Sequence, residues 1–174
     1  MKISEKGDIA LFELTNEYAS EMARLGDNPN IFRCVSDSFP SPYTKEKALE
    51  FIAMAKEKKK AHVFGVFWKG TFVGNIGLHF QSGLERKSVE IGYFIGEEYW
   101  GNGIATQAVS MMCEYGFNNL DINRIIGSVM DFNIGSMRVL EKCDFEKEGV
   151  FKQALIKLGK FHDDYRYAKL KKPD

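Results

Sequence analysis

Cysteine and histidine are scarce in this sequence, and neither forms a recognisable disulfide or metal pattern. The three cysteines, Cys34, Cys113 and Cys143, are odd in number, far apart and without a Cys-x-x-Cys pair. Such spacing favours free thiols in a reducing compartment. The three histidines also lack the spacing of a zinc site. We therefore expect no disulfide framework and no bound metal.

Long apolar runs and an excess of charge are missing as well. No stretch approaches the roughly 20 apolar residues of a membrane helix, and the first residues, Met-Lys-Ile-Ser-Glu, lack the apolar core of a signal peptide. Lys and Arg number 24, as do Asp and Glu, so no net field favours nucleic acid or an anionic membrane. These features predict a cytoplasmic protein that binds neither directly.

Apolar periodicity predicts alternating groups of strands and helices in a chain long enough for one core and short for two. Strands are expected at 9–14, 62–68, 72–80, 88–95, 124–130, 148–155 and 161–170, and helices at 19–25, 45–60, 103–117 and 134–143. This order is typical of an α/β or α+β domain with a mixed sheet and helices on its faces. Because no linker interrupts it, we predict a single domain over 1–174.

Two glycines one residue apart stand between the strand at 88–95 and the helix at 103–117. Gly101 and Gly103 let the backbone approach a ligand closely and adopt dihedrals that other residues avoid. The helix directs its free N–H groups and the positive end of its dipole at this turn, which predicts a phosphate or pyrophosphate site. A dinucleotide-binding unit has the same pattern, but it usually opens a βαβ domain rather than lying past mid-chain.

Four motifs follow one another in the order and spacing of a known family. They are Glu90-Ile-Gly-Tyr-x-Ile, Tyr99-Trp-Gly-Asn-Gly-Ile-Ala-Thr, Asn133-x-x-Ser136 and Glu141-Lys-x-x-Phe145-x-x-Glu148-Gly. On these motifs the chain resembles the GCN5-related N-acetyltransferases (GNAT), most closely the branch with ribosomal-protein N-terminal and spermidine acetyltransferases. The resemblance covers most of the chain. It implies a mixed, mostly antiparallel sheet with helices on both faces and acetyl-CoA as cosubstrate.

The resemblance also implies which residues hold acetyl-CoA. The glycine turn and the start of its helix would bind the pyrophosphate, and the backbone of the preceding strand would bind the pantetheine arm. Asn133 would bond the same arm or cap the following helix. The implied cosubstrate residues are Tyr93, Phe94, Ile95, Trp100, Gly101, Asn102, Gly103, Ile104, Ala105, Thr106 and Asn133.

Glu90 is an acidic residue in an otherwise apolar strand. A carboxylate there costs desolvation unless it has a partner or contacts water, and partial burial raises its pKa toward the range of a general base. In some members of the resembled family, a glutamate at this place accepts the proton of the amine. A structural, hydrogen-bonded carboxylate is the alternative interpretation.

The leaving thiolate of an acetyl transfer needs a proton or a hydrogen bond. Many relatives place a tyrosine seven residues after the Asn133 position, but Leu140 stands there in this chain. By resemblance Ser136 would bond the CoA sulfur, although helix capping also suits a serine. We therefore predict Glu90 and Ser136 as catalytic residues. The missing tyrosine supports a rival function, a non-catalytic CoA-binding regulatory module.

The resemblance implies direct acetyl transfer, in a ternary complex, to a primary amine on a protein N-terminus or a small molecule. The loop at 27–44 and the helix at 45–60 would form a wall of the acceptor site. Acidic residues there could attract a cation: Asp27, Asp37, Glu46 and Glu50. Aromatic residues in or beside loops are further candidates: Phe32, Phe39, Tyr43, Phe80 and Phe161. Peptides, polyamines and other amines stay open, and a homodimer is compatible with the family.

Overall fold

Eight strands form a single sheet in the computed structural model, which describes residues 1–173. Their order is β1-β2-β3-β4-β5-β6-β8-β7, and all neighbours are antiparallel except β5 and β6. The strands are β1 (Lys2–Lys6), β2 (Ile9–Glu13), β3 (Ala61–Trp68), β4 (Thr71–Phe80), β5 (Ser88–Ile95), β6 (Arg124–Met130), β7 (Glu146–Lys157) and β8 (Lys160–Leu170).

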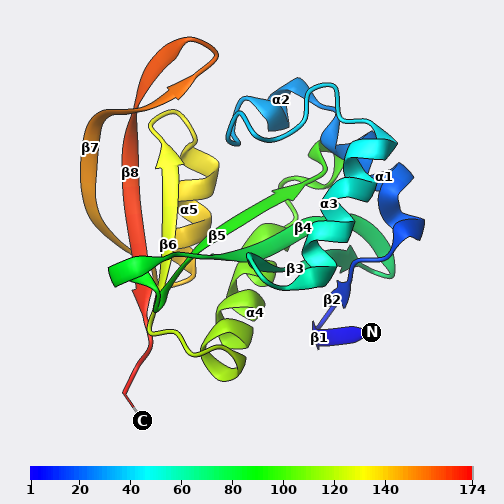
Figure 1. The fold of residues 1–174 in the computed structure, drawn as a ribbon, viewed down its shortest axis with the longest axis horizontal. Helices are drawn as coiled ribbons and strands as arrows, with labels where there is room; N and C mark the ends of the chain where they lie inside the picture. Colours follow the sequence, from blue (N-terminus) through cyan, green and yellow to red (C-terminus); the bar gives the residue numbers. More distant parts are fainter. Residues whose placement is uncertain (174) are drawn as a thin grey trace.

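Helices cover both faces of this sheet (Figure 1). They are α1 (Ala19–Gly26), α2 (Pro29–Phe32), α3 (Lys45–Glu57), α4 (Ile104–Asn119) and α5 (Ile134–Lys142), with short 3-10 helices at Asn16–Tyr18, Gly83–Glu85 and Glu97–Tyr99. The predicted mixed, mostly antiparallel sheet with helices on both faces is therefore confirmed. No helix within residues 1–173 combines the length and apolar character needed to cross a bilayer.

Two buried clusters, one on each face, explain why the central strands are apolar almost throughout. Phe64 and Val66 of β3 pack into the cluster that includes α4 and α5, whereas Val63 and Phe67 pack into the cluster that includes α1 and α3. Successive side chains of a strand point to opposite faces. A strand covered on both faces must therefore be apolar at nearly every position.

Local chemistry sets the ends of several helices. The Thr44 hydroxyl accepts a hydrogen bond from the Lys47 amide at 3.3 Å, which caps α3. The helix ends at Glu57, earlier than the predicted residue 60, because Lys58 has a left-handed backbone with φ of 53°. The sequence pattern did not predict β1 or α2, since five and four residues are too few to show a period.

The two parallel strands in the middle of the sheet separate after a short contact. Ser88–Glu90 of β5 pairs with Arg124–Ile126 of β6, and the pairing stops there. On its other side, β5 remains paired with β4 as far as Ile95. The second half of β5 therefore has a free edge that faces the gap toward β6, and this gap positions the site described below.

Candidate active site

Two cavities meet at the point where β5 and β6 separate. The first, here called the glycine-turn cavity, has a volume of about 800 Å³ and lies between α2, the turn before α4, and α5. The second, the sheet-face cavity, has about 880 Å³ and lies over β4, β5 and β6, beside α3 and the end of β7. Six residues line both of them: Cys34, Val35, Tyr93, Phe94, Asn133 and Ser136.

The glycine-turn cavity collects the predicted cosubstrate residues, all of which line it except Asn102. Gly101 and Gly103 have φ of 80° and 72°, and both have open space where a Cβ would stand. Gly103 is also the N-cap of α4, so the free N–H groups of the helix lie at this turn. The Asn102 side chain instead closes the turn, because it donates to the carbonyls of Tyr99 and Trp100 at 3.0 and 3.2 Å.

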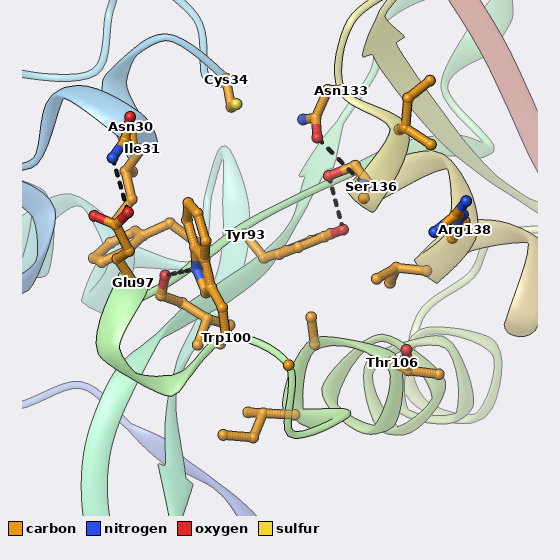
Figure 2. A pocket seen from close by; sticks show the side chains of 18 of the residues that line it. Asn30, Ile31, Cys34, Tyr93, Glu97, Trp100, Thr106, Asn133, Ser136 and Arg138 are labelled. Carbon is orange, nitrogen blue, oxygen red and sulfur yellow. Dashed lines mark hydrogen bonds between the residues drawn. The ribbon is translucent and has the colours of Figure 1, made fainter.

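Three cations line the same cavity, and sequence reasoning singled out none of them as ligand-binding. Arg33 follows α2, and Arg138 and Lys142 lie one turn apart on α5; Figure 2 shows Arg138 beside the labelled lining residues. The sequence does contain one signal for two of them: Arg138 and Lys142 are four positions apart, which places both on one face of the helix that begins after Asn133. Glu97 also lines the cavity, and its carboxylate accepts from the side-chain amides of Asn28 and Asn30. The three cations and the α4 N-terminus exceed this single negative charge, so the lining suits phosphate groups.

The free edge of β5 contributes backbone groups and one hydroxyl. Tyr93, Phe94 and Ile95 lie beyond the contact with β6 and line the glycine-turn cavity. The Ile95 carbonyl accepts from Trp100 Nε1 at 2.7 Å, which holds the indole beside the glycine turn (Figure 2). Backbone groups of Tyr93 and Phe94 that point toward the gap therefore have no strand opposite them among the described residues.

Two hydroxyls meet where the cavities join. Tyr93 Oη lies 3.1 Å from Ser136 Oγ, and Asn133 Oδ1 accepts from the Ser136 amide at 3.2 Å (Figure 2). Burial raises the pKa of Tyr93 to about 12, so this hydroxyl keeps its proton at neutral pH. Leu140 is buried in the core. The Tyr93 side chain is a second functional candidate, because the sequence interpretation gave this residue a backbone role alone.

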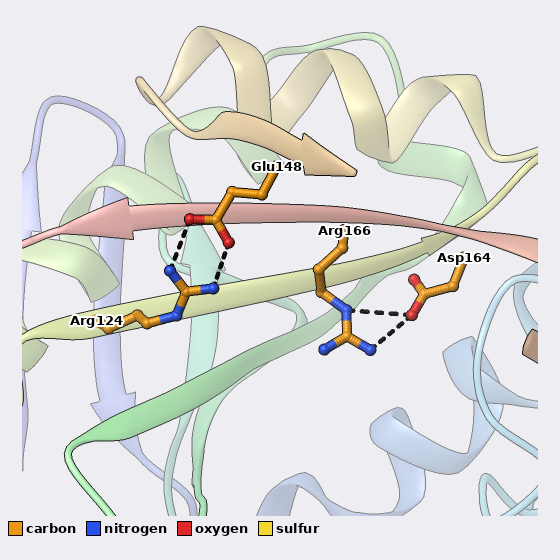
Figure 3. Close-up of polar contacts among 4 residues, drawn as sticks. All are labelled: Arg124, Glu148, Asp164 and Arg166. Carbon is orange, nitrogen blue, oxygen red and sulfur yellow. Dashed lines mark hydrogen bonds and ion pairs between the residues drawn. The ribbon is translucent and has the colours of Figure 1, made fainter. Parts of the chain in front are cut away.

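Glu90 lies in the sheet-face cavity and is half-buried. Burial raises the pKa of its carboxyl group, the nearby Arg166 opposes this shift, and Asp164 adds to it. Arg166 is itself paired with Asp164, which accepts from its Nη2 at 2.7 Å (Figure 3). Asp164 also accepts from Ser128 Oγ at 2.7 Å. Glu90 therefore sits beside an ion pair that is largely neutral as a whole.

A second ion pair holds the outer strands of this part of the sheet in place. Arg124 of β6 donates through two nitrogens to the Glu148 carboxylate of β7, with Nη1 at 2.7 Å from Oε1 (Figure 3). The contact crosses over β8, which lies between these strands. Such bidentate geometry restrains both side chains. The ion pair thereby links β6, which carries Ser128, to β7 across β8, which carries Asp164.

Four acidic residues were expected beside the acceptor site, and one of them lines a cavity. Asp37 lines the sheet-face cavity, and its carboxylate lies 2.9 Å from Lys157 Nζ. The other acidic candidates do not line either cavity: Asp27 accepts from the Tyr43 amide at 3.1 Å, Glu50 pairs with Lys47 at 2.9 Å, and Glu46 is exposed. These side chains serve the loop and the helix surface instead.

The aromatic candidates divide in the same way. Phe39 and Tyr43 line the sheet-face cavity, whereas Phe32, Phe80 and Phe161 line neither cavity. Phe161 is 67% exposed on β8. Two residues that the sequence gave no reason to select, Asn75 and His79 of β4, also line the sheet-face cavity. They stand in an apolar strand without a motif, so only the register of the sheet reveals them.

The geometry agrees with comparisons to known proteins. The family model described as "Acetyltransferase (GNAT) domain" matches residues 8–146. The chain belongs to the GNAT acetyltransferase family. Within this GNAT chain, the matched segment includes the glycine turn, Glu90, Asn133 and Ser136.

Relatives cover most of the length of this GNAT domain. The uncharacterized N-acetyltransferase YoaA of Bacillus subtilis (strain 168) is 32% identical over 157 residues, which are 83% of this chain and 88% of YoaA. A GNAT-family acetyltransferase from Bacillus anthracis has the same fold, with a TM-score of 0.85, 24% identity and coverage of 98% of both chains. RimL, a ribosomal L7/L12 alpha-N-protein acetyltransferase solved with coenzyme A, has a TM-score of 0.84, 20% identity and coverage of 98% of both chains.

Proposed function

We propose that this GNAT protein moves the acetyl group of acetyl-CoA directly to a primary amine, with both substrates bound at once. The observation that carries the proposal is the junction of the two cavities. One cavity has a glycine turn, a helix N-terminus and three cations, and the other has a half-buried carboxyl group. Tyr93 and Ser136 line both, so a donor and an acceptor can meet beside their hydroxyls.

The residues of the glycine-turn cavity fit a CoA ester. Free N–H groups after Gly103 and the side chains of Arg33, Arg138 and Lys142 would hold the phosphates. The unpaired backbone edge of β5 would bond the amides of the pantetheine arm. When bound, acetyl-CoA supplies an acyl group activated as a thioester. Crystals of RimL that contain coenzyme A support this choice of ligand.

The chemistry requires one proton acceptor and one hydrogen-bond donor. Glu90 takes the proton that the acceptor nitrogen loses, directly or through water, while the new carbon–nitrogen bond forms and the carbon–sulfur bond breaks. The hydroxyl pair of Tyr93 and Ser136 donates to the leaving sulfur. This pair takes the place of the tyrosine that many relatives have where Leu140 stands. A protein N-terminus, as in the RimL name, is one candidate acceptor.

The proposal is tested by measuring acetyl-CoA binding and CoA release on the same preparation. Calorimetry should show saturable acetyl-CoA binding, and free CoA should appear when a panel of primary amines and N-terminal peptides is added. Mass spectrometry should find the acetylated amine in an amount equal to the released CoA. Tight acetyl-CoA binding without turnover on any acceptor would instead favour the non-catalytic regulatory module.

A further inference from the structure

The floor of the sheet-face cavity contains two glycines that face each other on neighbouring strands. Gly77 of β4 is paired with Gly92 of β5, so these two positions add no side chain of their own to the floor. Two neighbouring side chains cover this pair instead: His79 Nε2 lies 3.4 Å from the Cβ position of both glycines, and Val63 Cγ2 lies 2.8 Å from that of Gly77. Glu90 is the cross-strand partner of His79. The carboxyl group and the imidazole therefore stand at one end of this strip of floor, here called the trough.

A buried amide stands at the other end of this trough. Asn75 is paired with Phe94, two positions beyond the glycine pair, and its side chain is on the same face of β4 as His79. Asn75 is 7% exposed and lines the cavity, so its amide borders the space that a ligand would fill. A bound ligand with one hydrogen-bonding group can pair with this amide there.

The walls between these polar ends are apolar and aromatic. Phe39 and Phe51 line the cavity together with Phe94, and Phe39 packs edge-on against the Phe94 ring, with centroids 5.4 Å apart. Met54 of α3 adds a flexible apolar side chain. Such walls favour a ligand whose body is apolar or aromatic, because it loses little hydration when it enters.

The charged residues that line the cavity can neutralise one additional cation. Its charged lining residues are Asp37, Glu90 and Lys157. Lys157 is 3% exposed, and its ammonium lies 2.9 Å from Asp37, without the geometry of a hydrogen bond, and 3.6 Å from the centre of the Phe32 ring. The opposite charges of this ion pair offset each other. Glu90 is the carboxyl group that remains to face an ammonium. A polyamine would bring additional cations that no carboxylate in the lining neutralises.

We propose, on the basis of the acetyltransferase function above, that the acceptor is a primary amine with an uncharged apolar or aromatic body. Its amine lies at Glu90 and His79, its body contacts Phe39, Phe51 and Phe94, and a hydrogen-bonding group on the body binds the Asn75 amide. A free arylalkylamine and a peptide whose N-terminal residue has such a side chain share this chemistry. Asn75 then determines specificity and takes no part in the chemical step.

Matched amines test the substrate class in the wild-type protein. CoA release is measured with tyramine, 2-phenylethylamine, butylamine and spermidine, and with short peptides that begin with Tyr or with Lys. We expect kcat/KM for tyramine to exceed that for spermidine by at least about ten-fold, and the two peptides to rank in the same order. Equal or better use of spermidine would overturn the inference and leave the acetyltransferase function intact. A lack of turnover with every amine would count against that function itself.

The role of Asn75 is tested with Asn75→Leu. We expect KM for tyramine to rise about ten-fold, since one hydrogen bond is lost and a polar group is left unpaired, while KM for 2-phenylethylamine changes by less than about two-fold. Asn118→Leu, at an exposed position of α4, is the matched control. An unchanged affinity for acetyl-CoA shows that the variant is folded, and Asn75→Asp provides a second variant if it is not. An equal change for both amines would contradict the assigned contact.

Discussion

The two cavities of the site are built in different ways. The glycine-turn cavity draws its central residues from short contiguous segments, the end of β5 with the turn before α4 and the start of α5, and it combines their backbone groups with the side chains of three cations. The sheet-face cavity gathers its lining from the loop after α2, from α3 and α5, and from five strands. A site drawn from a few neighbouring segments leaves a recognisable spacing in the sequence, whereas a site gathered from many distant elements leaves none.

The charges of the two cavities differ in the same sense as their proposed ligands. Arg33, Arg138 and Lys142 join a helix N-terminus in the first cavity, which suits an anionic donor. The second has Glu90 and a neutral Lys157–Asp37 pair, which suits an acceptor with a single positive charge. Changes in one cavity should therefore alter the binding or use of one substrate and leave that of the other nearly unchanged, and variants in each cavity test this separation.

The largest effect is expected from Glu90→Gln. Loss of the proton acceptor should lower kcat by about 100-fold, while the dissociation constant of acetyl-CoA stays within about two-fold. Stopped-flow or steady-state CoA release gives kcat, and calorimetry gives the affinity. Glu85→Gln, at an exposed position before β5, should behave as wild type. Unaltered turnover of Glu90→Gln would remove this residue from the mechanism.

The pH dependence of activity and of thermal stability tests the role of Glu90 in a second way. Because burial raises the pKa of its carboxyl group, the acid limb of kcat/KM should lie above the ordinary glutamate value. A folded-state pKa above the unfolded one also means that ionisation costs folding stability as pH rises through it. Glu90→Gln should therefore melt at an equal or higher temperature than wild type at pH 8, and the difference should shrink below pH 4. A lower Tm at pH 8 would indicate a structural hydrogen-bonded carboxylate.

A smaller effect is expected from Gly103→Ala. The alanine must adopt the left-handed backbone with φ of 72°, which costs about 1–2 kcal/mol, and relaxation of the turn should weaken acetyl-CoA binding by about ten-fold. Gly159→Ala is the matched control, since Gly159 has φ of 75° and equally open space, but lies in the β7–β8 turn. Both variants should lose similar stability in thermal melts. Equal losses of acetyl-CoA affinity would contradict a specific role for the glycine turn.

The smallest effect is expected at the junction of the cavities. Ser136→Ala and Tyr93→Phe should each lower kcat by about five-fold, because each leaves the partner hydroxyl to bond the leaving sulfur. The two oxygens are 3.1 Å apart, and the double variant leaves neither of them, so it should lose more than the product of the single losses. Kinetics of the four proteins at saturating acetyl-CoA measure this coupling. Strict multiplicativity would show that the hydroxyls act independently.

Local sequence rules anticipated many features of the molecule and missed others for identifiable reasons. Asn133 caps its helix, which is one of the two roles expected for this residue. The Tyr93 hydroxyl was missed because the residue that it meets, Ser136, is 43 positions away. The pairing of Lys157 with Asp37 has the same cause, since the two lie far apart in the chain.

The amino-acid sequence by itself determined the order of the elements, the mixed sheet with helices on both faces, and the glycine turn at the N-terminus of α4. These depend on local dihedral preferences and on apolar periodicity, which act over a few residues. Only the tertiary structure decided how β5 and β6 separate, which cations line the glycine-turn cavity, and that Asn75, His79 and Glu90 share one trough. Those contacts depend on strand register and on packing between distant segments, and no short-range pattern encodes them.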